Sequence, residues 1–228
     1  AGIDPALYDD CAAWQANPPH RWIYSRLAVA ETTGVRSAPL GVHPPECVPL
    51  VVKPVMNLHG MGRGARMVPA CESVSYEPSM MWQERLSGRH VSVDLRLDPH
   101  LGRAVWQATS VGQPHPERFG RFLMWELLGP DRLPETDIAE RWALTHLRHY
   151  AGPVNVELIG GRVIEVHLRL TQDWLESGVY GPHDTQPPPR ATLIPAWSDD
   201  DSEGDHGRIG YTVHRVGEKI QTALDVVM

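Results

Sequence analysis

Two short runs of alternating apolar and polar residues, at 154–159 and 162–168, are separated only by Gly160-Gly161. Alternation with a period of two predicts β-strands, and a glycine pair between two such runs is typical of a tight antiparallel turn. In each run the apolar residues share one face and most of the polar residues share the other. A chain that contains this hairpin must build antiparallel sheet, with one face of the hairpin buried against other elements.

The register of this hairpin follows from the need to keep both apolar faces on the same side. Paired residues must then have numbers with an even sum, as in Leu158 with Ile164 and Glu157 with Glu165. A two-residue turn at Gly160-Gly161 alone would pair Ile159 with Arg162, so the numbers of paired residues would have an odd sum. We therefore predict either a three-residue loop, Gly160-Gly161-Arg162, or a bulge, because a one-residue slip would expose one apolar face. This register places the two glutamates side by side.

Two carboxylates opposed on neighbouring strands repel each other unless a cation or a proton lies between them. A hard cation such as Mg²⁺, held by one or two carboxylates together with substrate phosphates, is the natural occupant. Glu157 and Glu165 are therefore candidate metal ligands. The alternative is an ordinary solvated sheet face on which one glutamate pairs with Arg162 or Arg169.

Lys53 ends an apolar run that predicts a strand over 48–55. It is one of only two lysines among 21 basic residues, so its place in an apolar run points to a specific role. Three glycines at alternate positions, 60, 62 and 64, follow it. Glycines let backbone N–H groups approach phosphate oxygens, and an ammonium group supplies a point charge. The pattern favours a phosphate site, with a plain hairpin turn as the alternative; a Walker loop is excluded because the lysine precedes the glycines.

Composition narrows the class of protein. The 228 residues allow one large domain or two small ones that share a cleft. A net charge of −7 argues against nucleic-acid binding, which depends on a basic surface. The apolar runs are far shorter than a membrane span, and the first residues lack the features of a signal peptide, so we expect a cytoplasmic protein. The three cysteines are widely spaced and form no C-x-x-C pair, which predicts neither a disulfide framework nor a zinc site.

Periodicity and turn residues predict the remaining elements. Helices are expected over 4–15, 20–33, 134–150 and 217–226, and strands over 80–86, 90–97, 102–111 and 207–214. The segment 117–128 fits either a helix or a strand. The segment 185–207, with the consecutive prolines 187–189 and an acidic run, is expected to be a solvated loop.

Four segments taken together resemble the ATP-grasp superfamily of carboxylate-amine and carboxylate-thiol ligases. They are Val51-Val52-Lys53-Pro54, the glycine loop at 60–64, the segment 82–88, and the hairpin residues 155–157 with 164–169. Their order and spacing agree with that superfamily over roughly residues 20 to 172. The resemblance implies an α+β fold in which two subdomains with antiparallel sheets enclose a nucleotide cleft.

The resemblance also implies roles for individual residues in binding ATP. Lys53 would hold the phosphates, and the loop 59–65 would be a mobile flap over them. The residues expected to contact the nucleotide are Lys53, Gly60, Gly62, Arg63, Gly64, Glu84, Arg85, Leu86 and Ile159. Among these, the hinge at 83–86 would meet adenine and ribose, with Glu84 as the side-chain contact, and Ile159 would cover the adenine ring.

For the chemistry, the resemblance implies that Glu157 and Glu165 hold Mg²⁺ between the phosphates and that Arg169 faces the transferred phosphoryl group. The superfamily usually has E-x-N where this chain has Glu165-Val166-His167, so the third metal position is His167. Imidazole is a poor ligand for Mg²⁺ but suits Mn²⁺ or Zn²⁺, and it can also act as a base. A second phosphate-binding lysine has no counterpart here, since only Arg36 lies in the corresponding segment.

The expected organisation is a smaller ATP-lid subdomain over about 48–86 and a larger metal-binding subdomain over about 87–228, with 1–47 packed beside it. The expected activity is ATP-dependent activation of a small carboxylate as an acyl-phosphate, followed by attack of an amine, which forms a carbon–nitrogen bond. Such ligases usually have a preceding α/β domain, and only 19 residues precede His20 here. A nucleotide-binding adaptor or pseudo-ligase, whose acceptor site comes from a partner chain or a homodimer, is therefore the alternative; an enzyme unrelated to ATP is a third interpretation.

Overall fold

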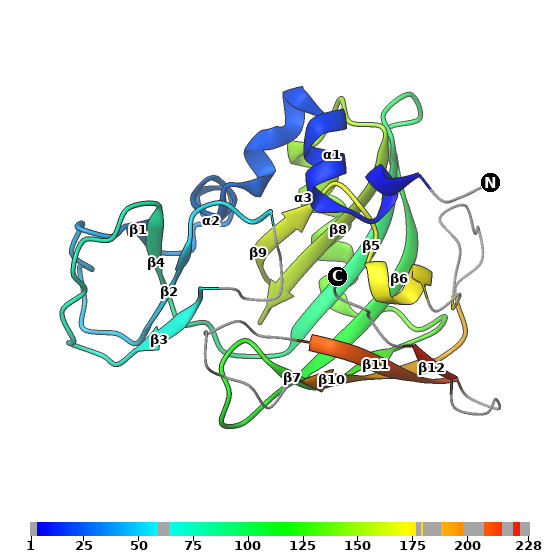
Figure 1. Cartoon of the computed structure of the whole chain (residues 1–228). Helices are drawn as coiled ribbons and strands as arrows, with labels where there is room; N and C mark the ends of the chain where they lie inside the picture. Colours follow the sequence, from blue (N-terminus) through cyan, green and yellow to red (C-terminus); the bar gives the residue numbers. More distant parts are fainter. Residues whose placement is uncertain are drawn as a thin grey trace.

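Two antiparallel sheets of unequal size organise the chain (Figure 1). The computed structural model describes residues 4–58, 64–176, 179, 188–197, 208–215 and 221–223. The described helices are two 3₁₀ helices, Pro5–Leu7 and Pro18–Tyr24, and α1 (Asp10–Ala16), α2 (Arg26–Thr33), α3 (Pro134–His146) and α4 (Gln172–Glu176). The described strands are β1 (Ser37–Pro39), β2 (Leu50–Pro54), β3 (Arg66–Val68), β4 (Met80–Glu84), β5 (His90–Asp98), β6 (Arg103–Pro114), β7 (Phe122–Leu127), β8 (Gly152–Ile159), β9 (Arg162–His167), β10 (Ala191–Trp197), β11 (Arg208–Arg215) and β12 (Gln221–Ala223).

The larger sheet has the order β12-β11-β10-β7-β6-β5-β8-β9, and the smaller sheet has the order β1-β4-β2-β3. Each has its own core: Val93, Val156 and Ala143 of α3 are buried in the larger one, and Val52 and Trp82 in the smaller one. Helix α2 contacts both β1 and β9 and so lies between the two sheets (Figure 1). These sheets confirm the predicted α+β class. None of the described helices has the length and apolar character needed to cross a membrane.

The β8–β9 hairpin pairs Glu157 with Glu165, as predicted from parity. The predicted bulge is also present, but the turn is the two-residue pair Gly160-Gly161, and Leu158 pairs with Val163 instead of Ile164. The extra residue, Ile164, is the one that the bulge inserts. The bulge lets Val163 enter the core while Ile164 lines the cavity described below, so the predicted apolar face for Ile164 was wrong.

The polar face of β5 is also buried at Ser92 and Asp94. Ser92 and Asp94 of that face each accept a hydrogen bond from Asn155 Nδ2 of β8, at 2.7 and 2.8 Å. The backbone N–H of Thr171 also donates to the Asp94 carboxylate, so the chain that follows β9 covers this part of the sheet. Satisfied hydrogen bonds make burial of these polar groups tolerable.

Two predicted helices are interrupted by capping residues. The helix expected over 4–15 divides at Asp9, whose carboxylate accepts a hydrogen bond from the N–H of Ala12 and so begins α1. The helix expected over 20–33 divides at Ser25, which caps α2 in the same way. Gly34 ends α2 with a φ of 66°, as a glycine after a helix commonly does.

Long-range pairing decides the elements that local pattern left open or misplaced. The ambiguous segment 117–128 contains strand β7, which pairs with β6. Residues 191–197, expected to be loop, form β10 between β7 and β11. The helix expected over 217–226 is wrong in its described part, because residues 221–223 form β12 against β11. The acidic run at 199–203 lies outside the described residues.

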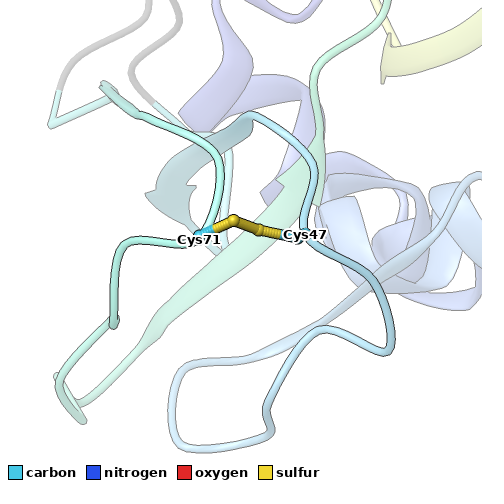
Figure 2. Close-up of a disulfide and its surroundings, with 2 residues drawn as sticks. All are labelled: Cys47 and Cys71. Carbon is cyan, nitrogen blue, oxygen red and sulfur yellow. A yellow bond between two sulfur atoms is a disulfide. The ribbon is translucent and has the colours of Figure 1, made fainter.

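Cys47 and Cys71 form a disulfide beside the smaller sheet (Figure 2), contrary to the prediction of none. Their Cα atoms are 4.7 Å apart, within the range that a disulfide requires. Strands β2 and β3 pair with Leu50 opposite Val68, and each cysteine lies three residues beyond that pair. The disulfide therefore joins two segments that the ladder has already brought together, which the spacing of the cysteines does not reveal.

Gly88, in the connection between β4 and β5, should not tolerate a side chain. Its φ is 119°, and an added Cβ would lie 2.6 Å from the Cα of Gly160. We expect Gly88→Ala to lower the free energy of unfolding by about 2–5 kcal/mol, from backbone strain plus overpacking. Urea unfolding followed by tryptophan fluorescence measures this loss.

The matched control is Gly102→Ala, because Gly102 has a φ of 57° and no atom within 4 Å of the added Cβ. It should lose only the roughly 1–2 kcal/mol that a left-handed conformation costs. Equal losses for the two variants would show that the contact between the β4–β5 connection and the β8–β9 turn is not close in solution.

Candidate active site

A cavity of about 1380 Å³ is lined by residues from both sheets and from the N-terminal helices. The smaller sheet and its connection to β5 contribute Val51, Lys53, Gln83, Arg85 and Leu86; the larger sheet contributes His90, Ser92, Asn155, Glu157, Ile159, Ile164, Glu165 and His167; α1 and α2 contribute Asp10 and Arg26. Pockets for one small ligand usually measure ~300–1,000 Å³, so this cavity has room for more than one substrate.

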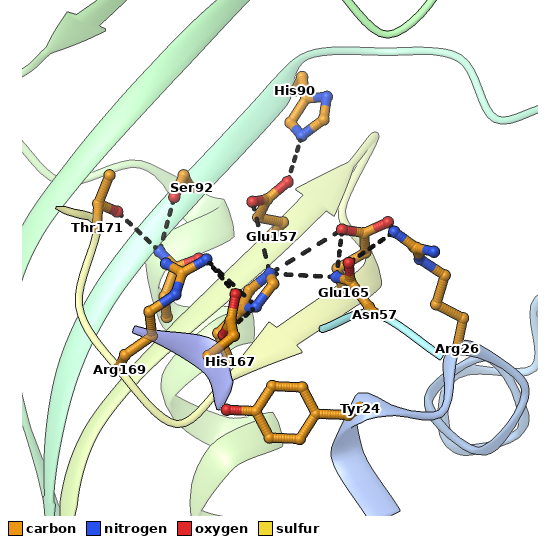
Figure 3. Close-up of polar contacts among 12 residues, drawn as sticks. Tyr24, Arg26, Asn57, His90, Ser92, Glu157, Glu165, His167, Arg169 and Thr171 are labelled. Carbon is orange, nitrogen blue, oxygen red and sulfur yellow. Dashed lines mark hydrogen bonds and ion pairs between the residues drawn. The ribbon is translucent and has the colours of Figure 1, made fainter. Parts of the chain in front are cut away.

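Glu157, Glu165 and His167 come together on the cavity face of β8 and β9 (Figure 3). One potential ligand atom from each lies within 4.8 Å of the others. His167 Nε2 is 3.9 Å from Glu157 Oε1 and 4.0 Å from Glu165 Oε2. Two carboxylates and one imidazole form a donor set that fits a divalent cation, since each carboxylate oxygen keeps lone pairs beyond those used in its hydrogen bonds. We call these three residues the metal cluster.

Glu165 is held in a cage of donors. Arg26 Nε and Asn57 Nδ2 each lie 2.7 Å from a different oxygen of its carboxylate, and Lys53 Nζ lies 3.8 Å away. Burial by itself would raise the pKa of Glu165, but the positive charges of Arg26 and Lys53 outweigh it and lower the pKa to about 2. The carboxylate is therefore ionised although it is buried.

The sequence analysis missed Arg26 and Asn57, and it also offered Arg162 or Arg169 as partners for the glutamates. Arg162 instead donates to the backbone carbonyl of Thr33, and Arg169 pairs elsewhere. Arg26 begins α2, and local pattern does not show whether an arginine at that position is buried.

Lys53 projects from β2 of the smaller sheet into the cavity and is buried. Burial lowers the pKa of its ammonium group to about 8, although the Glu165 carboxylate opposes that shift. A buried cation attracts an anion more strongly than a surface lysine does. Lys53 thus brings a positive charge from one sheet toward the acidic cluster on the other.

Glu157 has a different neighbour. Its Oε2 lies 3.0 Å from His90 Nε2 of β5, so in Figure 3 the carboxylate lies between His90 and His167. The His90 ring packs edge-on against Phe122 and Trp125, with centroids 4.9 and 5.3 Å away. The cavity therefore has an aromatic wall beside the metal cluster, which the sequence analysis did not predict.

Arg169 lines the cavity, and its Nη2 donates to Asp10 Oδ2 at 2.8 Å. Asp10 Oδ1 lies 2.9 Å from His167 Nδ1. Burial would raise the pKa of Asp10, but the nearby His167 and Arg169 lower it well below its ordinary value. The sequence analysis missed Asp10, which comes from a helix more than 150 residues before its partners.

In the predicted hinge, Arg85 and Leu86 line the cavity, whereas Glu84 does not. Its carboxylate accepts a hydrogen bond from Arg36 Nε at 2.7 Å on the other side of β4. Gln83 lines the cavity instead, and its buried Oε1 has no hydrogen-bond partner among the described residues. Strand alternation contains this signal, because Gln83 pairs with Val51, which is two residues from Lys53 and shares its face.

The remaining predicted contacts divide between described and undescribed residues. Ile159 lines the cavity together with Ile164. Gly64 lies against Pro54 and is not part of the cavity lining, whereas its neighbour Ala65 is. Gly60, Gly62 and Arg63 of the predicted flap lie outside the described residues.

Comparison with known proteins gives a clear result at the level of fold. No protein-family model matches the chain, and no curated protein sequence matches it. Among solved structures, it matches a putative ATP-grasp superfamily protein from Archaeoglobus fulgidus with a TM-score of 0.56 and 15% identity, over 89% of this chain and 65% of that one. It matches L-amino acid ligase from Bacillus licheniformis with a TM-score of 0.53 and 16% identity, over 90% and 57% of the two chains. The chain has the ATP-grasp fold.

A third match to the ATP-grasp fold is biotin carboxylase from Campylobacter jejuni in a β,γ-ATP complex, with a TM-score of 0.56 and 12% identity, over 89% of this chain and 59% of that one. The chain thus spans 57–65% of the length of these three structures. Identities this low establish the fold alone. They confirm the fold that the resemblance implied.

Proposed function

We propose that this protein is an ATP-dependent ligase that activates a small carboxylate as an acyl-phosphate for attack by an amine or a similar nucleophile. The observation that supports this most strongly is that Lys53 of the smaller sheet and the metal cluster of the larger sheet line the same cavity. Its structural neighbours include an L-amino acid ligase and a biotin carboxylase in a β,γ-ATP complex.

In this proposal the ATP phosphates bind Lys53 and the backbone of the predicted flap at Gly60, Gly62 and Arg63, whereas Gly64, which lies outside the cavity lining, does not contact them. Arg85, Leu86 and the free amide oxygen of Gln83 surround the base and ribose, and Ile159 covers the base. Residues 48–86 would act as the lid, and residues 87–228 as the metal-binding subdomain, with 1–47 beside it.

Glu157, Glu165 and His167 would hold a divalent cation, Mg²⁺ or Mn²⁺, which would neutralise charge on the phosphates. An oxygen of the substrate carboxylate attacks the γ-phosphorus, and the bond from that phosphorus to the bridging oxygen breaks to release ADP. The amine nitrogen then attacks the acyl carbon, phosphate leaves, and the amine loses a proton. Lys53 and Arg169 stabilise the transferred negative charge, because phosphoryl transfer depends mainly on positioning and electrostatics.

Calorimetric titration with the non-hydrolysable analogue AMP-PNP, with and without Mg²⁺ or Mn²⁺, tests the nucleotide site. We expect binding that depends on a divalent cation. Release of ADP in the presence of panels of carboxylates and amines, with products identified by mass spectrometry, then tests the reaction. Absence of AMP-PNP binding with either cation would overturn the proposal. Binding without ADP release across the panel would overturn the ligase reaction and favour a nucleotide-binding adaptor that needs a partner chain.

A further inference from the structure

His167 is 1% exposed and has polar neighbours at both ring nitrogens. Nδ1 lies 2.9 Å from Asp10 Oδ1, and Nε2 lies 3.3 Å from Asn57 Nδ2 and faces the two glutamates of the metal cluster. A neutral imidazole bears a proton on one nitrogen and a lone pair on the other. Which nitrogen bears the proton decides whether the ring can act as a ligand toward the cluster.

The hydrogen bonds of Asn57 indicate which nitrogen of His167 carries the lone pair. Arg26 Nη2 donates to Asn57 Oδ1 at 2.8 Å, and because arginine has no acceptor, this contact fixes which amide atom is oxygen. The other amide atom is therefore the NH₂ group, which donates to Glu165 Oε2 and also faces His167 Nε2. A donor that faces Nε2 is matched by a lone pair there, and a bound metal would take that lone pair while Asn57 keeps its 2.7 Å hydrogen bond to Glu165.

Nδ1 must then bear the proton and donate it to Asp10 Oδ1. Arg169 Nη2 donates to the other oxygen of Asp10 at 2.8 Å, shorter than its 3.4 Å contact with Nδ1, and so orients the carboxylate. Asp9, the neighbour of Asp10, caps α1. Asp10 is therefore not needed as a cap, and its carboxylate points to His167.

We infer that Asp10 is a positioning residue that fixes His167 as a nitrogen ligand of the metal cluster. As a result, the cluster prefers Mn²⁺ over Mg²⁺. This inference rests on the proposed function for the presence of a metal. Metal-binding histidines commonly donate their second N–H to a carboxylate, which fixes the tautomer and makes the ligand nitrogen more basic. Imidazole suits transition metals, whereas Mg²⁺ favours oxygen ligands alone.

Direct metal binding to the full chain tests this inference. Free Mn²⁺ is followed by electron paramagnetic resonance, and Mg²⁺ is measured by competition, both with and without AMP-PNP. We expect Mn²⁺ to bind at least about tenfold more tightly than Mg²⁺. His167→Asn should bring this ratio close to one, mainly by weakening Mn²⁺. Asp10→Asn should weaken Mn²⁺ by about 10- to 100-fold, as loss of such a carboxylate partner commonly does, and Asp10→Glu should recover part of the loss.

Asp9→Asn is the matched control, because it removes the same charge one residue away and asparagine still caps a helix. It should leave the Mn²⁺ affinity unchanged. Equal affinity of the wild-type protein for the two ions, or an Asp9→Asn loss as large as that of Asp10→Asn, would overturn the inference.

The tautomer of His167 can be measured directly in the absence of metal. Two-bond ¹⁵N–¹H correlation spectra, assigned with His167→Asn, should show the proton of His167 on Nδ1; a proton on Nε2 would overturn the inference. The two proposals can also fail separately. AMP-PNP binding without Mn²⁺ preference contradicts only the inference, and Mn²⁺ preference without AMP-PNP binding contradicts only the ligase proposal.

Discussion

Replacing Glu165 with alanine should lower the free energy of unfolding by about 3–5 kcal/mol, because removing one partner of a buried ion pair leaves uncompensated charge. The side chain of Arg26 is 4% exposed and that of Lys53 is 7% exposed, so neither cation reaches water when the carboxylate is removed. The same variant should lose divalent-metal binding, because one of the two carboxylates of the cluster is gone. Urea unfolding in EDTA and Mn²⁺ titration measure the two effects.

Glu77→Ala provides the control for this experiment. Glu77 also pairs with an arginine, Arg66, but the two side chains are 46% and 48% exposed. Exposed ion pairs contribute little, so we expect a loss within about 1 kcal/mol. If Glu165→Ala costs no more than Glu77→Ala, the donor cage around Glu165 does not form in solution.

The same carboxylate should make the metal-free protein sensitive to acid. The pKa of Glu165 is lowered from 4.5 to about 2, so its contribution to stability is complete above pH 4.5 and is lost as the pH falls toward 2. Glu165→Gln cannot titrate at this position. The difference in the free energy of unfolding between the wild type and Glu165→Gln should therefore shrink as the pH is lowered from 5 to 3. If the two proteins lose stability in parallel over this range, the lowered pKa of Glu165 is contradicted.

Replacing Lys53 with methionine should weaken nucleotide binding. Unlike Glu165→Ala, it should cause little loss in the free energy of unfolding. Removing a charge-assisted hydrogen bond to phosphate should weaken AMP-PNP binding by about 10- to 100-fold. The fold should tolerate the change because methionine avoids the cost of burying an ammonium group, and Glu165 keeps Arg26 as its partner. Calorimetry and urea unfolding measure the two quantities.

Arg66→Met is the matched control, since Arg66 pairs with Val52 on the neighbouring strand but lies outside the cavity lining. It should leave AMP-PNP affinity unchanged.

The pKa of Lys53 is lowered from 10.5 to about 8, so between these values the unfolded chain binds more protons and the stability of the wild type rises with pH. Relative to Lys53→Met, the wild type should gain stability over that range. Unchanged AMP-PNP binding by Lys53→Met would contradict its role at the phosphates.

Local pattern was sufficient for features that depend on neighbours in the sequence. Strand alternation predicted that Glu157 and Glu165 pair, and His167 shares their face because it lies two residues beyond Glu165. Lys53 was identifiable because lysine is rare in this chain and lies in an apolar strand. The motifs also indicated the fold that the solved structures confirm.

Other features depend on which distant segments pack together, and no local pattern encodes that. Strand β10 and the Cys47–Cys71 disulfide follow from ladders between segments whose pairing could not be predicted from either segment alone. The resemblance implied that Glu84 contacts the nucleotide, but the face of β4 that carries Glu84 turns away from the cavity, and Glu84 pairs with Arg36.

The strongest example is the environment of the metal cluster. Asp10 and Arg26 reach β9 from helices 157 and 139 residues away from their partners. A buried aspartate or arginine looks the same in the sequence as a surface one, because burial depends on the helix packing above it. Composition and spacing thus predicted Glu157 and Glu165 as candidates for a metal and Lys53 as a candidate for phosphate. The packing of α1 and α2 against β9 decided which charges surround them and which nitrogen of His167 faces the cluster.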